Sequence, residues 1–274
     1  MPDLAPTGLA PTGAARRASS PLAAVGRSVA SLVGLVGQIA LLGRQMLSAL
    51  RHGQLDRTEL VRQLYKMGWQ SLPIVAATAL FTGGIMVIQA APIVQRYGAH
   101  GLLGWGAGFG TLREIGPLLT ALMISGRVGA NNTAELGTMA VTEQIDGLRA
   151  LAIDPFGYLI LPRFLAIIVS AFFATVFADA LALVGAAYSG SWLLGVEPEL
   201  FYSGLTSGLL GFSDVAHGLI KSLVFGWLIA LSSCHHGIST QGGAPGVGRS
   251  VNATVVTSAA AIFGADYLLS FVIR

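Results

Sequence analysis

The chain has 274 residues, of which 53% are hydrophobic and only 11% are charged. A typical soluble domain carries about 25% charged residues, and the mean hydropathy here is +0.69. The composition therefore excludes an ordinary water-soluble domain and favours a protein that crosses a membrane several times. The net charge of +3 includes no Lys/Arg-rich cluster, so no binding of nucleic acid is expected.

The N-terminal part of the chain differs from the rest. Residues 1–27 are rich in Ala, Pro, Gly and Ser, which predicts a disordered tail because such a segment buries little apolar surface. Residues 28–50 are mostly apolar but are interrupted by Gln38 and Arg44, which favours a helix lying at the membrane surface. Residues 51–70 alternate charged and apolar groups and predict an amphipathic helix. Interfacial and amphipathic helices are thus expected over 28–70.

Five apolar segments follow, each long enough to cross the roughly 30 Å hydrocarbon core of a bilayer. The predicted fold class is therefore an all-α polytopic membrane protein with about five transmembrane helices. The third segment is too long for one untilted crossing and is expected to bend near the outer surface. The predicted spans are 71–95, 102–128, 164–196, 215–234 and 250–273.

Lysine and arginine predict the orientation, since cytoplasmic loops carry an excess of them. Eight of these residues precede residue 71, whereas residues 190–214 contain three acidic residues and no lysine or arginine. The N-terminus, residues 134–155 and the loop 235–250 are therefore expected in the cytoplasm, and the C-terminus on the outer side.

A short charged helix is expected over about 134–152, between the second and third spans. At about 100° per residue, Ile145 and Leu148 fall on an apolar face and Glu143 and Asp146 on the opposite arc. A helix resting on the membrane and a helix docking on a soluble partner both fit this pattern. The acidic polar face argues against the first, because surface-resting helices usually present Lys or Arg to anionic lipid.

Five short motifs then carry a resemblance. REIGP, GRVGA, AELGTM, TEQID and DP follow one another between residues 113 and 155. With them the chain resembles the MlaE/YrbE permease family over roughly residues 55–274. Members of that family are membrane subunits of ABC transporters that act on lipids together with MCE-domain proteins. The resemblance implies an MlaE-type permease domain over 71–274.

Partners and location also follow from the resemblance. It implies an ABC ATPase subunit, an MCE-domain lipid-binding protein, a second permease copy and the bacterial inner (plasma) membrane. Phospholipid is the expected cargo. Glycine spacings such as Gly104-x-x-x-Gly108 and Gly204-x-x-x-Gly208 permit close helix approach and would fit a dimer of permeases.

The resemblance also implies two sites. It makes the helix at 134–152 the coupling helix, which sits in a groove of the ATPase, and it places a lipid pocket between two permease copies near the outer side. Arg113 and Glu114 are the polar candidates for that pocket, although pairing with neighbouring helices is an alternative role for them. The coupling positions are Glu135, Thr142, Glu143, Gln144 and Asp146, and the pocket positions are Ile93, Val94, Tyr97, Arg113 and Glu114.

The chain is not expected to be an enzyme or to hydrolyse ATP itself. Its only lysines, Lys66 and Lys221, lie outside any G-x-x-x-x-G-K-[ST] motif, so the glycine-rich loop 242–250 is assigned to a turn. ATP and Mg²⁺ are therefore expected on a separate ATPase subunit. No cofactor, metal site or catalytic residue is expected in this chain.

Charged residues inside spans are rare and are usually functional or paired. Asp179 and Lys221 should lie at similar depths, which predicts a buried structural pair. If Glu114, Asp179 or Asp266 carried protons instead, the chain would be an ion-gradient-driven transporter of amphiphiles. An intramembrane enzyme built on Cys234 and a passive scaffold are further alternatives.

Overall fold

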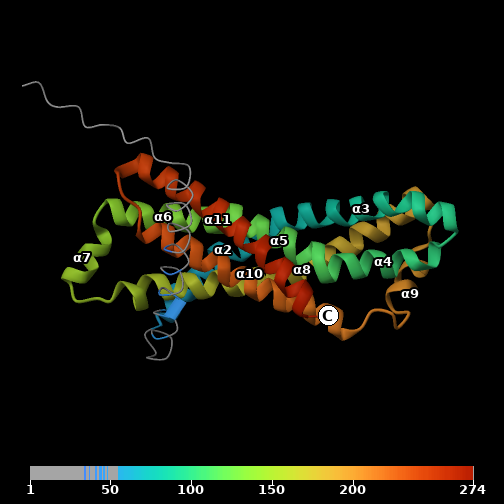
Figure 1. Ribbon diagram of the computed structural model, residues 1–274, viewed down its shortest axis with the longest axis horizontal. Coiled ribbons are helices and arrows are strands. Elements are labelled where there is room, and N and C mark those ends of the chain that lie inside the picture. The colour runs from blue at the N-terminus through green and yellow to red at the C-terminus, as the bar shows by residue number, and fades with distance from the viewer. Residues whose placement is uncertain are drawn as a thin grey trace, which may run out of the picture.

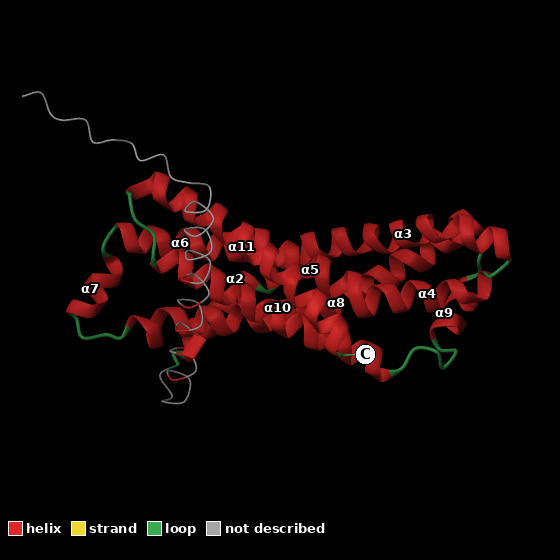
Figure 2. Cartoon of the chain, viewed as in Figure 1, coloured by secondary structure: helices red, strands yellow, loops and turns green. Residues whose placement is uncertain are grey.

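The computed structural model describes residues 55–273 and a few single positions between 34 and 48. The predictions for residues 1–27, and most of those for 28–50, lie outside the described residues. Figure 2 shows that the regular elements of the described part are all helices. They are α2 (Arg57–Met67), η1 (Trp69–Ser71), α3 (Leu72–Tyr97), η2 (His100–Leu102), α4 (Leu103–Gly110), η3 (Thr111–Ile115), α5 (Gly116–Ile124), η4 (Ser125–Gly129), α6 (Ala130–Val141), α7 (Gln144–Ala150), η5 (Phe156–Ile160), α8 (Leu161–Leu194), α9 (Pro198–Leu205), α10 (Phe212–Ile238) and α11 (Gly243–Val272).

Local sequence explains where several helices begin and end. Asp56 caps α2, because its side chain accepts hydrogen bonds from the backbone N–H groups of Thr58 and Glu59. Gly98 and Gly195 end α3 and α8 in left-handed backbone conformations, with φ of 63° and 62°. Glycine adopts this conformation without the steric cost that a Cβ would add.

Among the described residues, four helical segments are long and apolar enough to cross a membrane, and they cover four of the five predicted spans. The remaining predicted span, 102–128, lies in a continuous helical run from α4 to α6. This run is less apolar than the other four because it carries Arg113, Glu114 and Arg127. This run packs on α8 and α10 and returns the chain along the molecule (Figure 1). The fold is thus all-α and polytopic, as predicted. The four apolar segments are Arg57–Tyr97, Phe156–Leu194, Phe212–Ile238 and Gly243–Val272.

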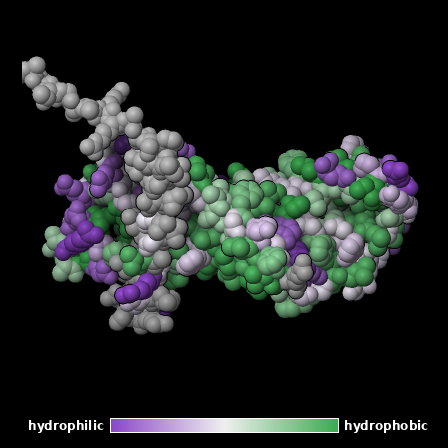
Figure 3. Space-filling view, in the orientation of Figure 1, coloured by the Kyte–Doolittle hydropathy of each residue, from purple (hydrophilic) through white to green (hydrophobic). Residues whose placement is uncertain are grey.

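The molecule is elongated along the direction of its helices (Figure 1). Hydrophobic side chains cover most of the middle of the face in Figure 3, and hydrophilic ones gather at the α7 end and near the end of α3. The long axis therefore lies across the membrane. The predicted third span is a single helix, α8, whose 34 residues extend about 51 Å.

Two hydrophobic cores follow one another along this axis. The smaller core, which includes Val87, Val94 and Phe201, joins α3, α4, α8 and α9 at the α9 end. The larger core, which includes Leu136, Ile167 and Ile229, joins α6, α8 and α10 toward the α7 end. α10 and α11 contribute residues only to the larger core. α11 ends well short of the α9 end of the molecule (Figure 1).

Small residues let the helices approach backbone to backbone. A Cβ placed on Gly83 of α3 would lie 1.8 Å from the carbonyl oxygen of Ala182 in α8. A Cβ on Gly104 would likewise lie 1.9 Å from the carbonyl oxygen of Phe201 in α9. The glycine spacing that begins at Gly104 is therefore used within the chain, between α4 and α9.

This close approach predicts the effect of a valine at Gly83. Gly83→Val forces α3 and α8 apart and should lower the free energy of unfolding by about 1–3 kcal/mol or more, as overpacking does. Gly106→Val is the matched control, because Gly106 has no atom within 4 Å of its ideal Cβ position. Thermal unfolding of both purified variants in one mild detergent measures the difference. Equal unfolding temperatures for the two variants would contradict the packing described.

Candidate functional site

The segment predicted to be one coupling helix is two helices in the structure. α6 ends at Val141, Glu143 takes a left-handed backbone conformation with φ of 60°, and α7 begins at Gln144. Such a conformation costs a residue other than glycine on the order of 1–3 kcal/mol, and Ala152 adopts it again beyond α7 with φ of 58°. The prediction of a continuous helix over 134–152 was therefore wrong, because left-handed residues bound α7 on both sides.

The tip that contains α7 presents a polar outer surface. Thr142, Glu143, Gln144 and Asp146 are all exposed, whereas Ile145 is 7% exposed and packs into the larger core. The Gln144 Nε2 group donates to Thr142 Oγ1 at 3.0 Å. We call these four exposed residues the coupling surface.

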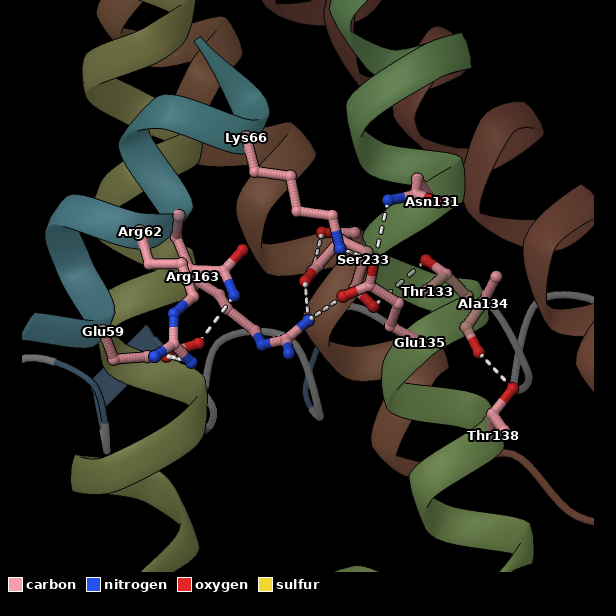
Figure 4. Close-up of polar contacts among 12 residues, drawn as sticks. Glu59, Arg62, Lys66, Asn131, Thr133, Ala134, Glu135, Thr138, Arg163 and Ser233 are labelled. Carbon is pink, nitrogen blue, oxygen red and sulfur yellow. Dashed lines mark hydrogen bonds and ion pairs between the residues drawn. The ribbon is translucent and has the colours of Figure 1, made fainter. Parts of the chain in front are cut away.

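Glu135, the fifth predicted coupling residue, does not belong to this surface. Its carboxylate forms ion pairs with Lys66 of α2 and with Arg163 of α8, at 2.8 Å for the arginine (Figure 4). The Asn131 Nδ2 group donates to the same carboxylate at 2.8 Å. Its ion-pair partners lie 69 and 28 residues away in the chain and tie the carboxylate to α2 and α8, so a contact of Glu135 with an ATPase stays a prediction.

The contacts of Glu135 continue into a fourth helix. Arg163 is 3% exposed and also donates to Asn132 Oδ1 at 3.4 Å, while the Asn132 amide donates to Ser233 Oγ of α10 at 3.0 Å. Burial alone would raise the pKa of Glu135, but the hydrogen bonds from Lys66 and Arg163 outweigh it and lower the pKa below its ordinary value. We call Glu135, Lys66, Arg163, Asn131 and Asn132 the Glu135 network.

Sequence reasoning did not single out this network. Arg163 was not considered as part of a site, although a charge between two apolar stretches is a signal of a buried partner. Its position at the start of α8 places it 3% exposed beside α6. The network ties α6, which leads directly to the coupling surface, to α2, α8 and α10.

A second group of charges lies where the two cores meet. The π-helical turn η3 carries Arg113, whose Nη1 pairs with Asp214 Oδ1 at 3.1 Å. Its Nη2 donates to the carbonyl oxygen of Ile273 at 3.3 Å. Asp214 also accepts a hydrogen bond from the backbone N–H of Gly211 at 3.0 Å and so helps to begin α10. Arg113 therefore joins the start of α10 to the end of α11.

Lys221 occupies the centre of this group. It is fully buried and forms ion pairs with Glu114 and, at 2.8 Å, with Asp266. The hydroxyl of Ser270 accepts a hydrogen bond from Lys221 at 2.7 Å. One buried cation thus holds two carboxylates from η3 and α11. We call Arg113, Glu114, Asp214, Lys221 and Asp266 the junction cluster.

The predicted pair of Asp179 with Lys221 was wrong. Asp179 is buried on α8 and faces Gly116, whose ideal Cβ position lies 1.8 Å from Asp179 Oδ1. This oxygen has no hydrogen-bond partner among the described residues. The prediction rested on similar depth, and depth does not determine the direction in which a helix presents a side chain.

The predicted pocket residues do not form one group in this chain. Ile93 and Tyr97 are 62% and 73% exposed near the end of α3, whereas Val94 is buried in the smaller core. Arg113 lies ten residues beyond Leu103, where α4 begins, which corresponds to about 15 Å along the axis. The three residues of α3 therefore lie at a different level from the charges of η3. Whether they hold lipid stays a prediction.

Comparison with known proteins defines the family. The family model described as Permease MlaE matches residues 60–272, so the chain belongs to the MlaE permease family. A probable ABC transporter permease protein of Synechocystis sp. is 38% identical over 237 residues, covering 86% of this chain and 89% of the relative. One of Rickettsia felis is 34% identical over 246 residues, covering 90% and 95%.

A third relative carries a more specific name. The intermembrane phospholipid transport system permease protein MlaE of Haemophilus influenzae is 30% identical over 211 residues, covering 77% of this chain and 81% of the relative. The family membership predicted from the five motifs is confirmed. The chain is a multi-pass membrane permease.

The junction cluster predicts unequal effects at its two central residues. Lys221→Met leaves Glu114 and Asp266 without their cation and should lower the free energy of unfolding by about 3–5 kcal/mol, as breaking a buried pair does. Glu114→Gln should cost less, because Lys221 keeps Asp266 and the Glu114 side chain is 38% exposed. Thermal unfolding of both variants in detergent compares them. A Glu114→Gln variant as unstable as Lys221→Met would rule out Lys221 as the centre of the cluster.

Proposed function

We propose that this chain is the membrane permease subunit of an ATP-driven phospholipid transporter that works with an MCE-domain lipid-binding protein. Family membership and the printed names of the relatives support transport. The observation that carries the ATP-driven mechanism is the coupling surface, an exposed polar tip that continues directly from α6. The ATPase, with its ATP and Mg²⁺, would be a separate subunit that binds this surface.

The structure supports a path for movement from the ATPase into the membrane. α7 is anchored by Ile145 and follows α6 after a two-residue turn, so a displacement of α7 moves α6. The ion pairs of Glu135 with Lys66 and Arg163 then pass this displacement to α2 and α8. Short ordered elements transmit displacement in this way, whereas a flexible loop absorbs it.

The lipid pocket is proposed between two permease copies, on the side away from α7. Tyr97 and Ile93 are exposed there, and Glu114 keeps 38% of its side chain exposed despite its ion pair. A surface that is largely apolar with a few charges suits an amphiphile. In this arrangement the α7 end faces the cytoplasm of a bacterial cell and the end of α11 faces outward.

A gradient-driven transporter is the second candidate. Asp179 favours it, since one oxygen of its buried carboxyl group has no hydrogen-bond partner within the described part of the chain, and ionisable groups inside a membrane mark proton relays in pumps and transporters. The junction cluster argues against Glu114 and Asp266 in that role, because Lys221 pairs with both carboxylates.

The first test concerns the ATPase. Glu143→Lys reverses the charge at one of the two acidic positions of the coupling surface and should reduce recovery of an ABC ATPase in a pull-down by about tenfold, since charge complementarity sets partner choice. Glu199→Lys is the matched control, because Glu199 is exposed on α9 at the opposite end. Mass spectrometry of the bound proteins measures both. If no ATPase accompanies the wild-type chain, the proposed function fails.

The second test separates the two candidate functions. The wild-type complex, reconstituted into vesicles that contain a fluorescent phospholipid, should transfer that lipid only when ATP is supplied. Collapse of the proton gradient with an ionophore should leave this transfer unchanged, and Glu143→Lys should abolish it. Transfer that continues without ATP and stops with the ionophore would instead establish the gradient-driven transporter.

A further inference from the structure

A polar cavity lies between α2–η1 and η4–α6, in the half of the molecule nearer α7. It has a volume of about 330 Å³ and adjoins the Glu135 network. It includes no residue of the coupling surface or of the junction cluster. The lining residues are Lys66, Met67, Gln70, Ser71, Arg127, Val128 and Asn131.

The cavity carries an excess of positive charge. Two of its lining residues, Lys66 and Arg127, are cations, and none is a carboxylate. Lys66 and Arg163 both form ion pairs with Glu135, so one negative charge already balances two positive charges only in part. Arg127 is exposed and has no ion-pair partner among the described residues. Its guanidinium is therefore available to an external anion.

The other polar groups of the lining suit an anion with several oxygens. Gln70 and Asn131 each carry an amide NH₂ group with two donors, and Arg127 adds five N–H donors in a planar fork. Such a fork binds phosphate through two parallel hydrogen bonds. Arg127 also lies at the centre of the π-helical turn η4. π-Helical turns are rare and are frequent at functional sites.

The surroundings of the cavity favour a phosphate that carries apolar chains. Met67 and Val128 line it beside the polar groups. Tyr65 and Trp69, on the same α2–η1 segment, are 60% and 66% exposed. Exposed tyrosine and tryptophan are typical of the level of lipid headgroups in a membrane. A phosphate at this level belongs to a lipid headgroup rather than to the solvent.

We propose that this cavity binds the phosphate group of a phospholipid in the membrane leaflet at the α7 end. The site is separate from the lipid pocket proposed on the other side, and its existence does not require ATP-driven transport. Lys66 and Asn131 both contact Glu135 and both line the cavity. A bound phosphate therefore shares donors with the network that holds α6, and lipid occupancy would affect the helix that leads to the coupling surface.

Lipid retention by the full-length chain tests this site. The chain is purified in a neutral detergent, and native mass spectrometry compares bound phosphatidylglycerol with bound diacylglycerol of the same acyl chains. Wild type should retain phosphatidylglycerol in preference to diacylglycerol. Arg127→Gln should weaken that retention about tenfold, the effect of losing one charge-assisted contact. Arg127→Lys, which keeps the charge, should retain more lipid than Arg127→Gln.

Arg57→Gln is the matched control, because Arg57 is exposed at the start of α2 and does not line the cavity. It should leave retention unchanged. Equal losses in Arg57→Gln and Arg127→Gln would show nonspecific attraction to surface charge and overturn the site. Undiminished lipid retention in Arg127→Gln would also overturn the site. Displacement of the lipid by added inorganic phosphate would assign the cavity to free phosphate and overturn the lipid proposal. None of these outcomes bears on the pull-down of the ATPase.

Discussion

The ion pairing of Glu135 with Lys66 and Arg163 organises the part of the molecule nearest α7. A charge removed from water is expensive unless an opposite charge and hydrogen-bond donors meet it. One carboxylate on α6 meets this requirement for cations from α2 and α8. The relative rotation of α6 and α8 is then constrained at this point, because the buried Arg163 would otherwise lose its carboxylate, and the partly exposed Lys66 adds α2 to the same contact.

The junction cluster applies the same constraint at a second level. Lys221 is fully buried between Glu114 and Asp266, and Arg113 joins Asp214 to the end of α11. These contacts lie where the smaller core ends and where α10 begins. The level of η3 is thus where charged contacts hold α10 and α11 to the helical run from α4 to α6.

Periodicity and composition were sufficient for the all-helical class and for the long apolar helices. Long apolar runs predicted five spans, four of which are long apolar helices among the described residues, and Asp56 and Gly98 have the residue types that begin and end helices. Sequence reasoning failed at the break near Glu143, because a left-handed backbone at a residue other than glycine leaves no pattern in the sequence. The turn at Glu143 in the folded chain breaks the helix that the periodicity of 134–152 predicted.

Sequence reasoning also failed to predict which charged residues pair with one another inside the membrane. Asp179 and Lys221 have similar depths, but Lys221 faces α11 and η3, whereas Asp179 faces Gly116. Depth follows from counting residues, but the facing direction depends on how helices pack around one another. Glu135 shows the same limit, because its motif grouped it with the residues of the exposed tip and did not predict its ion pairs with Lys66 and Arg163. Motifs identified the family, and three-dimensional contacts were needed to separate exposed from internal members of one motif.

The ion pairs of α6 and α7 differ in strength in a way that matters for coupling. Within α7, Arg149 and Asp146 pair at 2.7 Å with exposed fractions of 59% and 67%, and such exposed pairs contribute about 0–1 kcal/mol. The Glu135–Arg163 pair has a nearly buried arginine, and breaking a buried pair costs about 3–5 kcal/mol. The tip can therefore adjust its polar contacts to a partner at little cost, while α6 keeps its place against α2 and α8. A docking element needs an adaptable surface on a firmly held helix. Docking of a partner then moves α6 together with α2 and α8 and does not break the contacts between them.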